Sequence, residues 1–306
     1  MGLFCFSCPP TPLMLRIALP NKGRLSEDAR DVFADAGLEV RARGERALTA
    51  SLGGEFEALF VRAQDVPEFV ADGAADAGVT GRDLVAESGR ALDELLDLEF
   101  GRCRLVVAAR DESGITSLDG LVDIGRGPPR VATAFPRLTQ RFFASMGRPI
   151  DIVPMSGATE IAPHLGIADI VVDLTSTGST LKMNGLREIA TVLESTAQLV
   201  AAPRGTSSLS AGQRCALDDL VMALGSVLRA RGQRYLMANV PRNALDRVKQ
   251  IVPGLNGPTI IDILDGGSFV AVHVVVPAAS IYRTIASLKS LGAEGILVAR
   301  IERLMP

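Results

Sequence analysis

The sequence contains no tryptophan, and aromatic residues make up only 4% of its 306 residues. Hydrophobic residues still account for 47% of the chain, so we expect cores built from Val, Leu, Ile and Ala. No apolar run approaches the roughly 18 residues that a membrane-spanning helix needs, and no membrane span is therefore expected. The length is sufficient for two or three domains.

An excess of charge of one sign is also missing. The formal net charge is −3, with acidic and basic residues interspersed. A surface that binds nucleic acid needs a basic patch, and no basic helix-turn-helix segment precedes residue 15. We therefore expect no nucleic-acid partner.

Cysteine and histidine are scarce. The four cysteines, at positions 5, 8, 103 and 215, form no disulfide-like framework, which indicates a reducing compartment, the cytoplasm. Cys103 is either a nucleophile or a half-buried thiol, and the absence of a histidine nearby in the sequence favours the thiol. The only histidines, His164 and His273, suggest no nucleophile–base pair.

The first thirteen residues differ from the rest of the chain. They are apolar and rich in proline but lack the basic start of a signal peptide. The Cys5-x-x-Cys8 pair has no second pair to complete a metal site. We expect residues 1–13 to be a disordered extension, or the product of an upstream start codon with Met14 as the natural beginning.

The segment from Asp169 to Thr180 has the composition of an anion-binding loop. An apolar strand, Ile170–Leu174, runs into Thr, Ser and Gly residues and then into a helix predicted over Leu181–Glu188. Hydroxyls and free backbone N–H groups there would hold a phosphate, Gly178 would allow close approach, and Asp173 would accept hydrogen bonds from a sugar. The alternative is an ordinary turn with an N-capping hydroxyl.

A second candidate lies at the start of the fold. A strand over Leu15–Pro20 is followed by Lys22 and Arg24 on either side of a glycine, and Ser26 is predicted to cap a helix that extends through Ala36. The carboxyl end of a first strand is a common ligand position in open α/β sheets. The alternative is a solvated basic turn.

The order of the predicted elements gives the architecture. Strands and helices alternate up to a long helix over Ser210–Arg231, which predicts two α/β lobes around a cleft. The last seventy or so residues follow the order βαββαβ of a ferredoxin-like module, with a hairpin turn at Asp265-Gly266-Gly267.

Four segments together with the tail resemble the ATP phosphoribosyltransferase family in its long form. They are Leu15–Leu25, Asp76–Gly81, Ser156–Glu160 and Asp173–Leu181, followed by Pro253-Gly254, Pro258-Thr259 and Leu291-Gly292-Ala293. The likeness extends from about residue 14 to the end. It implies an α/β fold with a two-lobed, periplasmic-binding-protein-like catalytic core and an ACT-like regulatory domain. The implied boundaries are 14–104 plus 194–230 for lobe I, 105–193 for lobe II and 231–306 for the regulatory domain.

The resemblance implies that adenine N1 of ATP displaces pyrophosphate from phosphoribosyl pyrophosphate, with Mg²⁺ bridging the pyrophosphate oxygens, in the first step of histidine biosynthesis. Carried over to this chain, Asp173 holds the ribose and Glu160 contacts ribose or metal, although Glu160 is equally explained as an acid at a helix start. Lys22, Arg24, Arg62 and Arg104 contact ATP and the polyphosphates. The phosphate loop consists of Thr175, Ser176, Thr177, Gly178, Ser179 and Thr180.

The resemblance also implies that L-histidine binds between adjacent tail modules as an inhibitor, in a homo-oligomer from dimer to hexamer. Asn239 and Thr259 are the expected contacts, and Asn239 stands where relatives place an acid.

Two other function classes remain open from the residues. Two lobes around a cleft also describe a non-catalytic small-molecule-binding protein, such as a solute-binding protein or the effector domain of a regulator. The phosphate loop by itself would also fit a different phosphoribosyltransferase. Neither alternative explains both the loop and the terminal βαββαβ module.

Overall fold

The computed structural model describes residues 14–42, 44, 47–123, 127–205, 208–263 and 267–305. The chain divides into two compact units, the first ending at Val221 and the second beginning at Met222, within helix α6 (Ala211–Ala230). The extension expected over residues 1–13, with Cys5 and Cys8, lies outside the described residues, as do Asp265 and Gly266 of the expected hairpin turn.

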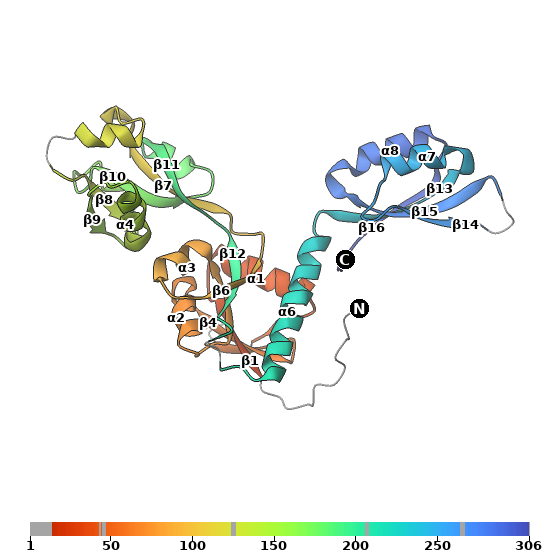
Figure 1. The fold of residues 1–306 in the computed structure, drawn as a ribbon, viewed down its shortest axis with the longest axis horizontal. Helices are drawn as coiled ribbons and strands as arrows, with labels where there is room; N and C mark the ends of the chain where they lie inside the picture. Colours follow the sequence, from red (N-terminus) through yellow and green to blue (C-terminus); the bar gives the residue numbers. More distant parts are fainter. Residues whose placement is uncertain are drawn as a thin grey trace. The chain divides into compact units, whose positions relative to one another are not determined.

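The first unit begins with a seven-stranded sheet, which we call lobe I together with its helices (Figure 1). Strand β1 (Leu15–Pro20) is central and runs parallel to both β4 (Phe56–Val61) and β5 (Ala77–Gly81), so the carboxyl ends of these strands meet at one edge. The sheet order is β2-β3-β4-β1-β5-β12-β6. The other elements of lobe I are β2 (Val40–Arg41), β3 (Thr49–Leu52), β6 (Asp93–Asp97), β12 (Ala197–Ala201), α1 (Arg24–Asp35), η1 (Ala63–Asp65), α2 (Val66–Ala71) and α3 (Arg82–Ser88).

A five-stranded sheet forms lobe II, in the order β11-β7-β10-β8-β9. The chain passes from lobe I to lobe II between Asp97 and Cys103 and returns between Ser195 and Ala197. Two lobes joined by two crossings form the expected periplasmic-binding-protein-like core. The elements of lobe II are β7 (Cys103–Arg110), η2 (Asp111–Ser113), η3 (Leu118–Asp123), β8 (Arg130–Thr133), α4 (Pro136–Ser145), β9 (Asp151–Pro154), η4 (Thr159–Ile161), β10 (Ile170–Thr175), α5 (Ser179–Met183) and β11 (Leu186–Ser195).

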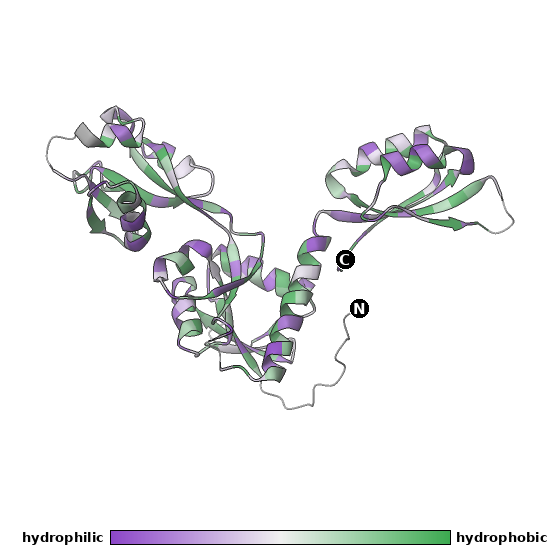
Figure 2. Cartoon of the chain, viewed as in Figure 1, coloured by the Kyte–Doolittle hydropathy of each residue, from purple (hydrophilic) through white to green (hydrophobic). Residues whose placement is uncertain are grey.

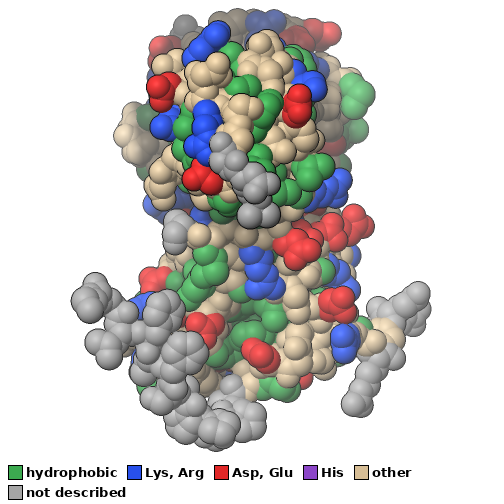
Figure 3. All heavy atoms as spheres, turned by 90° about the vertical axis from the view of Figure 1, so that its right-hand side faces the viewer, with side chains coloured by type: hydrophobic (Ala, Val, Ile, Leu, Met, Phe, Trp, Pro, Cys, Tyr) green, Lys and Arg blue, Asp and Glu red, His purple; other side chains and the backbone are tan. Residues whose placement is uncertain are grey.

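The interiors of both lobes are largely aliphatic, as the composition predicts. Among the largest fully buried side chains, only Phe33 and Phe143 are aromatic, and the others are Leu or Ile. The hydrophobic colour in Figure 2 follows the strands, where most of these residues lie. Lys and Arg alternate with Asp and Glu on the face shown in Figure 3, so the described residues there form no broad region of one charge. No helix in the described part of the chain is long and apolar enough to cross a membrane.

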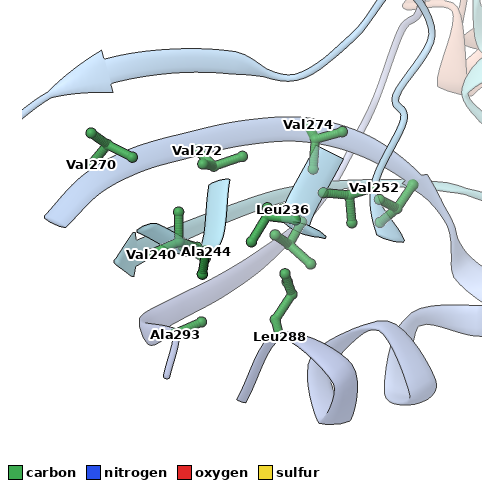
Figure 4. Packing of buried hydrophobic residues seen from close by; sticks show 12 residues of the cluster. Leu236, Val240, Ala244, Val252, Val270, Val272, Val274, Leu288 and Ala293 are labelled. Atoms are coloured by element: carbon green, nitrogen blue, oxygen red, sulfur yellow. The ribbon is translucent and has the colours of Figure 1, made fainter. Parts of the chain in front are cut away.

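The second unit has the predicted element order. Its strands pair antiparallel in the order β14-β15-β13-β16, which is the strand order of a ferredoxin-like sheet. Helices α7 and α8 lie on one face of the sheet (Figure 1), over a core that includes Leu236, Val272 and Leu288 (Figure 4). The elements are β13 (Gln233–Pro241), η5 (Arg242–Ala244), α7 (Leu245–Ile251), β14 (Thr259–Asp262), β15 (Phe269–Pro277), η6 (Ala278–Ser280), α8 (Ile281–Ser290) and β16 (Glu294–Arg300). The fold class predicted from the sequence is confirmed.

Two local predictions are wrong. The helix expected over Leu181–Glu188 ends at Met183, because Gly185 adopts a left-handed conformation and the chain then forms the ten-residue strand β11, which pairs with β7. Ser26 does not cap α1: the helix begins at Arg24 after Gly23, whose φ of 80° suits glycine, and Ser26 is buried in the first turn.

Candidate active site

The hydroxyl-rich loop of lobe II is a tight turn whose side chains face solvent. Strand β10 ends at Thr175, and its hydroxyl accepts a hydrogen bond of 2.8 Å from the N–H of Gly178. Gly178 has φ of 76° and precedes α5, and its side-chain-free position provides no N-cap. The hydroxyl of Thr177 accepts the N–H of Ser179 at 3.4 Å, so part of the loop's hydroxyl content serves the turn itself. Four side chains of the loop are exposed and available to a ligand: Ser176, Thr177, Ser179 and Thr180.

Asp173 is held half-buried beside this loop. One of its carboxylate oxygens accepts the N–H of Leu174 at 2.7 Å, and the other accepts the hydroxyl of Thr159. Thr159 begins η4, in which half-buried Glu160 is the next residue, so the structure brings the segments of both predicted acids together. A carboxylate has about four lone-pair positions, which leaves Asp173 able to accept further hydrogen bonds from a ligand.

Arg24 meets the loop from the other lobe. A cavity of about 390 Å³ is lined by Arg24, Gly81 and Asp83 of lobe I and by Thr175 and Ser176 of lobe II. The remaining lining residues are Leu25, Leu84, Gly101, Arg102, Cys103 and Leu174. Residues far apart in the sequence thus form one site between the lobes.

Arg104 lies beside the same loop. In the sheet, Arg104 of β7 pairs with Thr175, the last residue of β10. Arg104 also lines a second cavity of about 390 Å³ together with Ser176, Arg82 and Arg102. The cavity wall also carries the carboxylates of Asp97 and Glu194. The three guanidinium groups could still hold polyphosphate, because arginine binds phosphate oxygens in a bidentate manner.

The other two predicted cations lie elsewhere. Lys22 and Arg62 follow the adjacent carboxyl ends of β1 and β4, where the N–H of Asn21 donates to Val61 at 2.8 Å. Both side chains are exposed, and neither lines the cavities described above. A role for them in ATP binding stays a prediction, whereas Arg24 and Arg104 are placed at the loop.

Comparison with known proteins decides the family. The family model for HisG, ATP phosphoribosyltransferase, matches residues 62–225, and the model for the HisG C-terminal domain matches residues 230–303. The chain belongs to the ATP phosphoribosyltransferase family. It is therefore a transferase of histidine biosynthesis, and the resemblance stated from the sequence is confirmed.

Relatives agree over nearly the whole length. An ATP phosphoribosyltransferase of Gemmatimonas aurantiaca is 68% identical over 294 residues, which are 96% of this chain and 100% of that protein. One from Natronomonas pharaonis is 46% identical over 95% of this chain and 100% of its own length. A solved ATP phosphoribosyl transferase (HisG:HisZ) complex from Thermotoga maritima matches with a TM-score of 0.60 and 29% identity, over 71% of this chain and 99% of that one.

Sequence reasoning missed a buried group in the wall of the Arg24 cavity. Asp83, at the start of α3, is 4% exposed, and burial raises its pKa. Ser195 donates a hydrogen bond of 2.5 Å to this carboxylate and accepts the N–H of Asp83 at 3.1 Å. One signal was present, because a side chain at Gly81 would lie 2.3 Å from the Asp83 carboxylate, and a glycine two residues before an acid at a strand end marks such a close approach.

Cys103 belongs to the same cluster and lines both cavities. Burial raises the pKa of its thiol, the charge of Asp83 raises it further, and the hydrogen bond with Ser195 acts in the opposite direction. A raised pKa disfavours the thiolate, so the site agrees with the interpretation of Cys103 as a half-buried thiol.

The two residues predicted to contact histidine lie on one face of the C-terminal sheet. Asn239 of β13 pairs with Ala271, and Thr259 of β14 pairs with His273, so the two residues flank β15 on the face opposite the buried core. The neighbouring Tyr235 hydroxyl and His273 Nδ1 are 2.7 Å apart on the same face. In the described part of this unit the two helices pack on the other face, so Asn239 and Thr259 are accessible to a ligand.

Proposed function

We propose that this chain joins N1 of the ATP adenine to C1 of phosphoribosyl pyrophosphate, giving N1-(5-phosphoribosyl)-ATP and pyrophosphate. The C1–O bond to pyrophosphate breaks with its electron pair as the N1–C1 bond forms. The observation that supports this proposal is the meeting of the Thr175–Thr180 loop with Arg24 in one cavity between the lobes, in a chain of the ATP phosphoribosyltransferase family.

Each residue has a role that its position supports. Hydroxyl and backbone donors of Ser176–Thr180 hold the 5′-phosphate, while Asp173 accepts hydrogen bonds from the ribose hydroxyls. Arg24 and Arg104 contact the phosphates of the two substrates from two cavities that are both lined by Ser176 of the loop. Glu160, on the segment bonded to Asp173 through Thr159, contacts the ribose or its metal.

The proposed chemistry is electrostatic. As pyrophosphate leaves, the ribose ring becomes positive and the leaving group becomes negative, so a carboxylate beside the ring and guanidinium groups beside the phosphates stabilise the transition state. In this proposal Asp173 is the carboxylate beside the ribose ring, and Arg104 is one of the guanidinium groups beside the phosphates. Holding both substrates in one cavity removes much of the entropic cost of their encounter.

Mg²⁺ fits this site as an ion that arrives with the substrate. The described residues form no cluster of three or more His, Cys, Asp or Glu that would hold a metal by itself. Mg²⁺ keeps several waters and needs only one or two carboxylates when it is bound to phosphates, and Asp173 and Glu160 would supply them. When bound, the ion would neutralise charge on the leaving pyrophosphate.

The C-terminal unit is proposed to be the regulatory part. L-Histidine would bind on the sheet face that carries Asn239 and Thr259, between modules of neighbouring subunits in an assembly from dimer to hexamer. Inhibition requires that histidine bind one arrangement of the assembly more tightly than the other. The scarcity of cysteine and the biosynthetic family support a cytoplasmic location.

Substitution of Asp173 tests the assignment of the loop. Steady-state pyrophosphate release should show kcat/KM for phosphoribosyl pyrophosphate lowered by about tenfold or more in Asp173→Ala, since a charge-assisted hydrogen bond is worth about 1.5–3 kcal/mol. Asp151→Ala, which removes an exposed acid of the same lobe, is the matched control. Full activity of Asp173→Ala with an unchanged circular dichroism spectrum would contradict the assignment.

A further inference from the structure

A third cavity is lined by the part of the phosphate loop that follows Ser176. It has a volume of about 600 Å³ and is lined by Thr177, Gly178, Arg104 and Glu188, with Asp111, Leu181, Lys182, Leu186 and Arg187 completing its wall. Three cations and two acids line this space. The reaction proposed above gives no task to Glu188, although its carboxylate lies against Gly178 of the loop.

Glu188 occupies the space that Gly178 leaves open. A Cβ atom at Gly178 would lie only 2.7 Å from Glu188 Oε1. The close approach that a glycine permits is therefore used in this structure by a carboxylate of the chain itself. A carboxylate and a phosphate share negative charge and an arrangement of acceptor oxygens.

The same carboxylate binds the cation expected to meet the substrate. Arg104 Nη1 lies 2.9 Å from Glu188 Oε2, and Arg104 Nη2 donates to Oε1 at 3.3 Å. The two oxygens of Glu188 thus engage both terminal nitrogens of the guanidinium in a bidentate pair. With this pair formed, Arg104 has fewer donors to offer a phosphate.

We propose that Glu188 is an internal stand-in for a substrate phosphate, which occupies Arg104 and the Gly178 loop until phosphoribosyl pyrophosphate displaces it. This inference rests on the proposed function, because it takes the loop as the phosphate site. Glu188 is then an affinity-determining residue: it keeps Arg104 ordered in the free enzyme and lowers the apparent affinity for the substrate.

The replacement of Glu188 by a substrate phosphate at Arg104 is energetically reasonable. The side chains of Arg104 and Glu188 are 35% and 30% exposed, and ion pairs with this much solvent contact contribute only about 0–1 kcal/mol. A phosphate group carries more charge than a carboxylate and offers more acceptor oxygens, so it would replace Glu188 at Arg104. Released into the cavity, Glu188 is left beside Lys182 and Arg187, which line the same space.

The test is the binding of phosphoribosyl pyrophosphate, measured by titration calorimetry on the full chain with Mg²⁺ and without ATP. Glu188→Gln keeps the shape of the side chain but removes its charge, and we expect its Kd to be about two- to fivefold lower than that of the parent chain. If Glu188 instead serves to position Arg104 for the substrate, Glu188→Gln will bind more weakly.

Two comparisons make the result specific. Asp111→Asn removes one negative charge from the same cavity, but Asp111 pairs with Arg187 at 3.2 Å and not with Arg104, so we expect less than a twofold change. In a double-mutant cycle, the gain from Glu188→Gln should vanish in an Arg104→Gln background.

The outcomes separate the inference from the proposed function. Tighter binding that requires Arg104 supports the inference. Binding by the parent chain with equal or weaker binding by Glu188→Gln overturns the inference alone, as does an equal gain in Asp111→Asn. Absence of binding in every folded variant overturns both the inference and the proposed function.

Discussion

The hydroxyl of Ser195 donates a hydrogen bond of 2.5 Å to Asp83 Oδ1, although the two residues are 112 positions apart in the sequence. Ser195 is the last residue of β11, at the point where the chain returns to lobe I, and Asp83 is in the first turn of α3. The N–H of Arg82 also donates to the carbonyl of Thr196 at 3.0 Å. The start of α3 is thereby fastened to one of the two connections between the lobes.

Asp83→Asn should change how stability depends on pH. Because burial raises the pKa of Asp83 in the folded chain, the unfolded chain releases this proton first as pH rises above the ordinary carboxyl pKa. The free energy of unfolding of the parent chain therefore falls through that window, until the raised pKa is passed. Asparagine does not titrate, so the stability of the variant relative to the parent should increase from pH 4 to pH 8. Urea unfolding followed by circular dichroism measures this difference, and a pH-independent difference would contradict the account.

Cys103 should react slowly with alkylating reagents. Burial and the charge of Asp83 raise the pKa of its thiol, so little thiolate is present at pH 7.5. Time-resolved labelling with iodoacetamide, read by peptide mass spectrometry, should show exposed Cys215 modified before Cys103. Asp83→Asn should accelerate labelling of Cys103 because it removes the nearby charge. Equal rates at Cys103 in the two chains would argue against this electrostatic coupling.

Arg24 and Lys22 should differ in importance despite lying two residues apart. Arg24 lines the cavity with Thr175 and Ser176, whereas Lys22 lines neither of the two cavities that contain Ser176. Arg24→Gln should lower kcat/KM by about tenfold or more, the value of a lost charged hydrogen bond. Lys22→Gln should lower it by less than about threefold. The reverse order in steady-state kinetics would show that ATP is bound at the carboxyl end of β1 instead.

Asn239→Asp should strengthen the response to L-histidine. A carboxylate at this position on the open sheet face would pair with a cationic group of the amino acid, which an amide does less well. The concentration of histidine for half-inhibition should fall by about three- to tenfold, and Thr259→Val should raise it. If both variants respond like the parent chain, histidine is bound on another surface.

Much of this fold follows from local patterns. The aliphatic strand Leu15–Pro20 is found as expected, and the strands and helices after residue 231 follow the predicted order βαββαβ. The turn at Gly178 was also predicted, because glycine and hydroxyl residues favour turns, and its binding of phosphate stays a prediction.

The missed features depend on distant partners. The sequence predicts that the first residues of β11 continue the helix α5. Only the pairing of β11 with β7 makes this segment a strand. Strand β6 has acids at both ends, Asp93 and Asp97, and is formed by pairing with β12. Asp83 looks like an ordinary helix-start acid. Gly81 signals a close approach, but nothing nearby in the sequence identifies Ser195 as the partner.

The most direct test of the account is a continuous ultraviolet assay with ATP, phosphoribosyl pyrophosphate and Mg²⁺, with pyrophosphatase present to draw the reaction forward. The account predicts the spectrum of an N1-substituted adenine, a product whose mass is that of ATP plus one phosphoribosyl group, and suppression of the reaction by millimolar L-histidine. Product that histidine does not suppress would contradict the proposed role of the C-terminal unit. Absence of this product from well-folded protein would contradict the central claim.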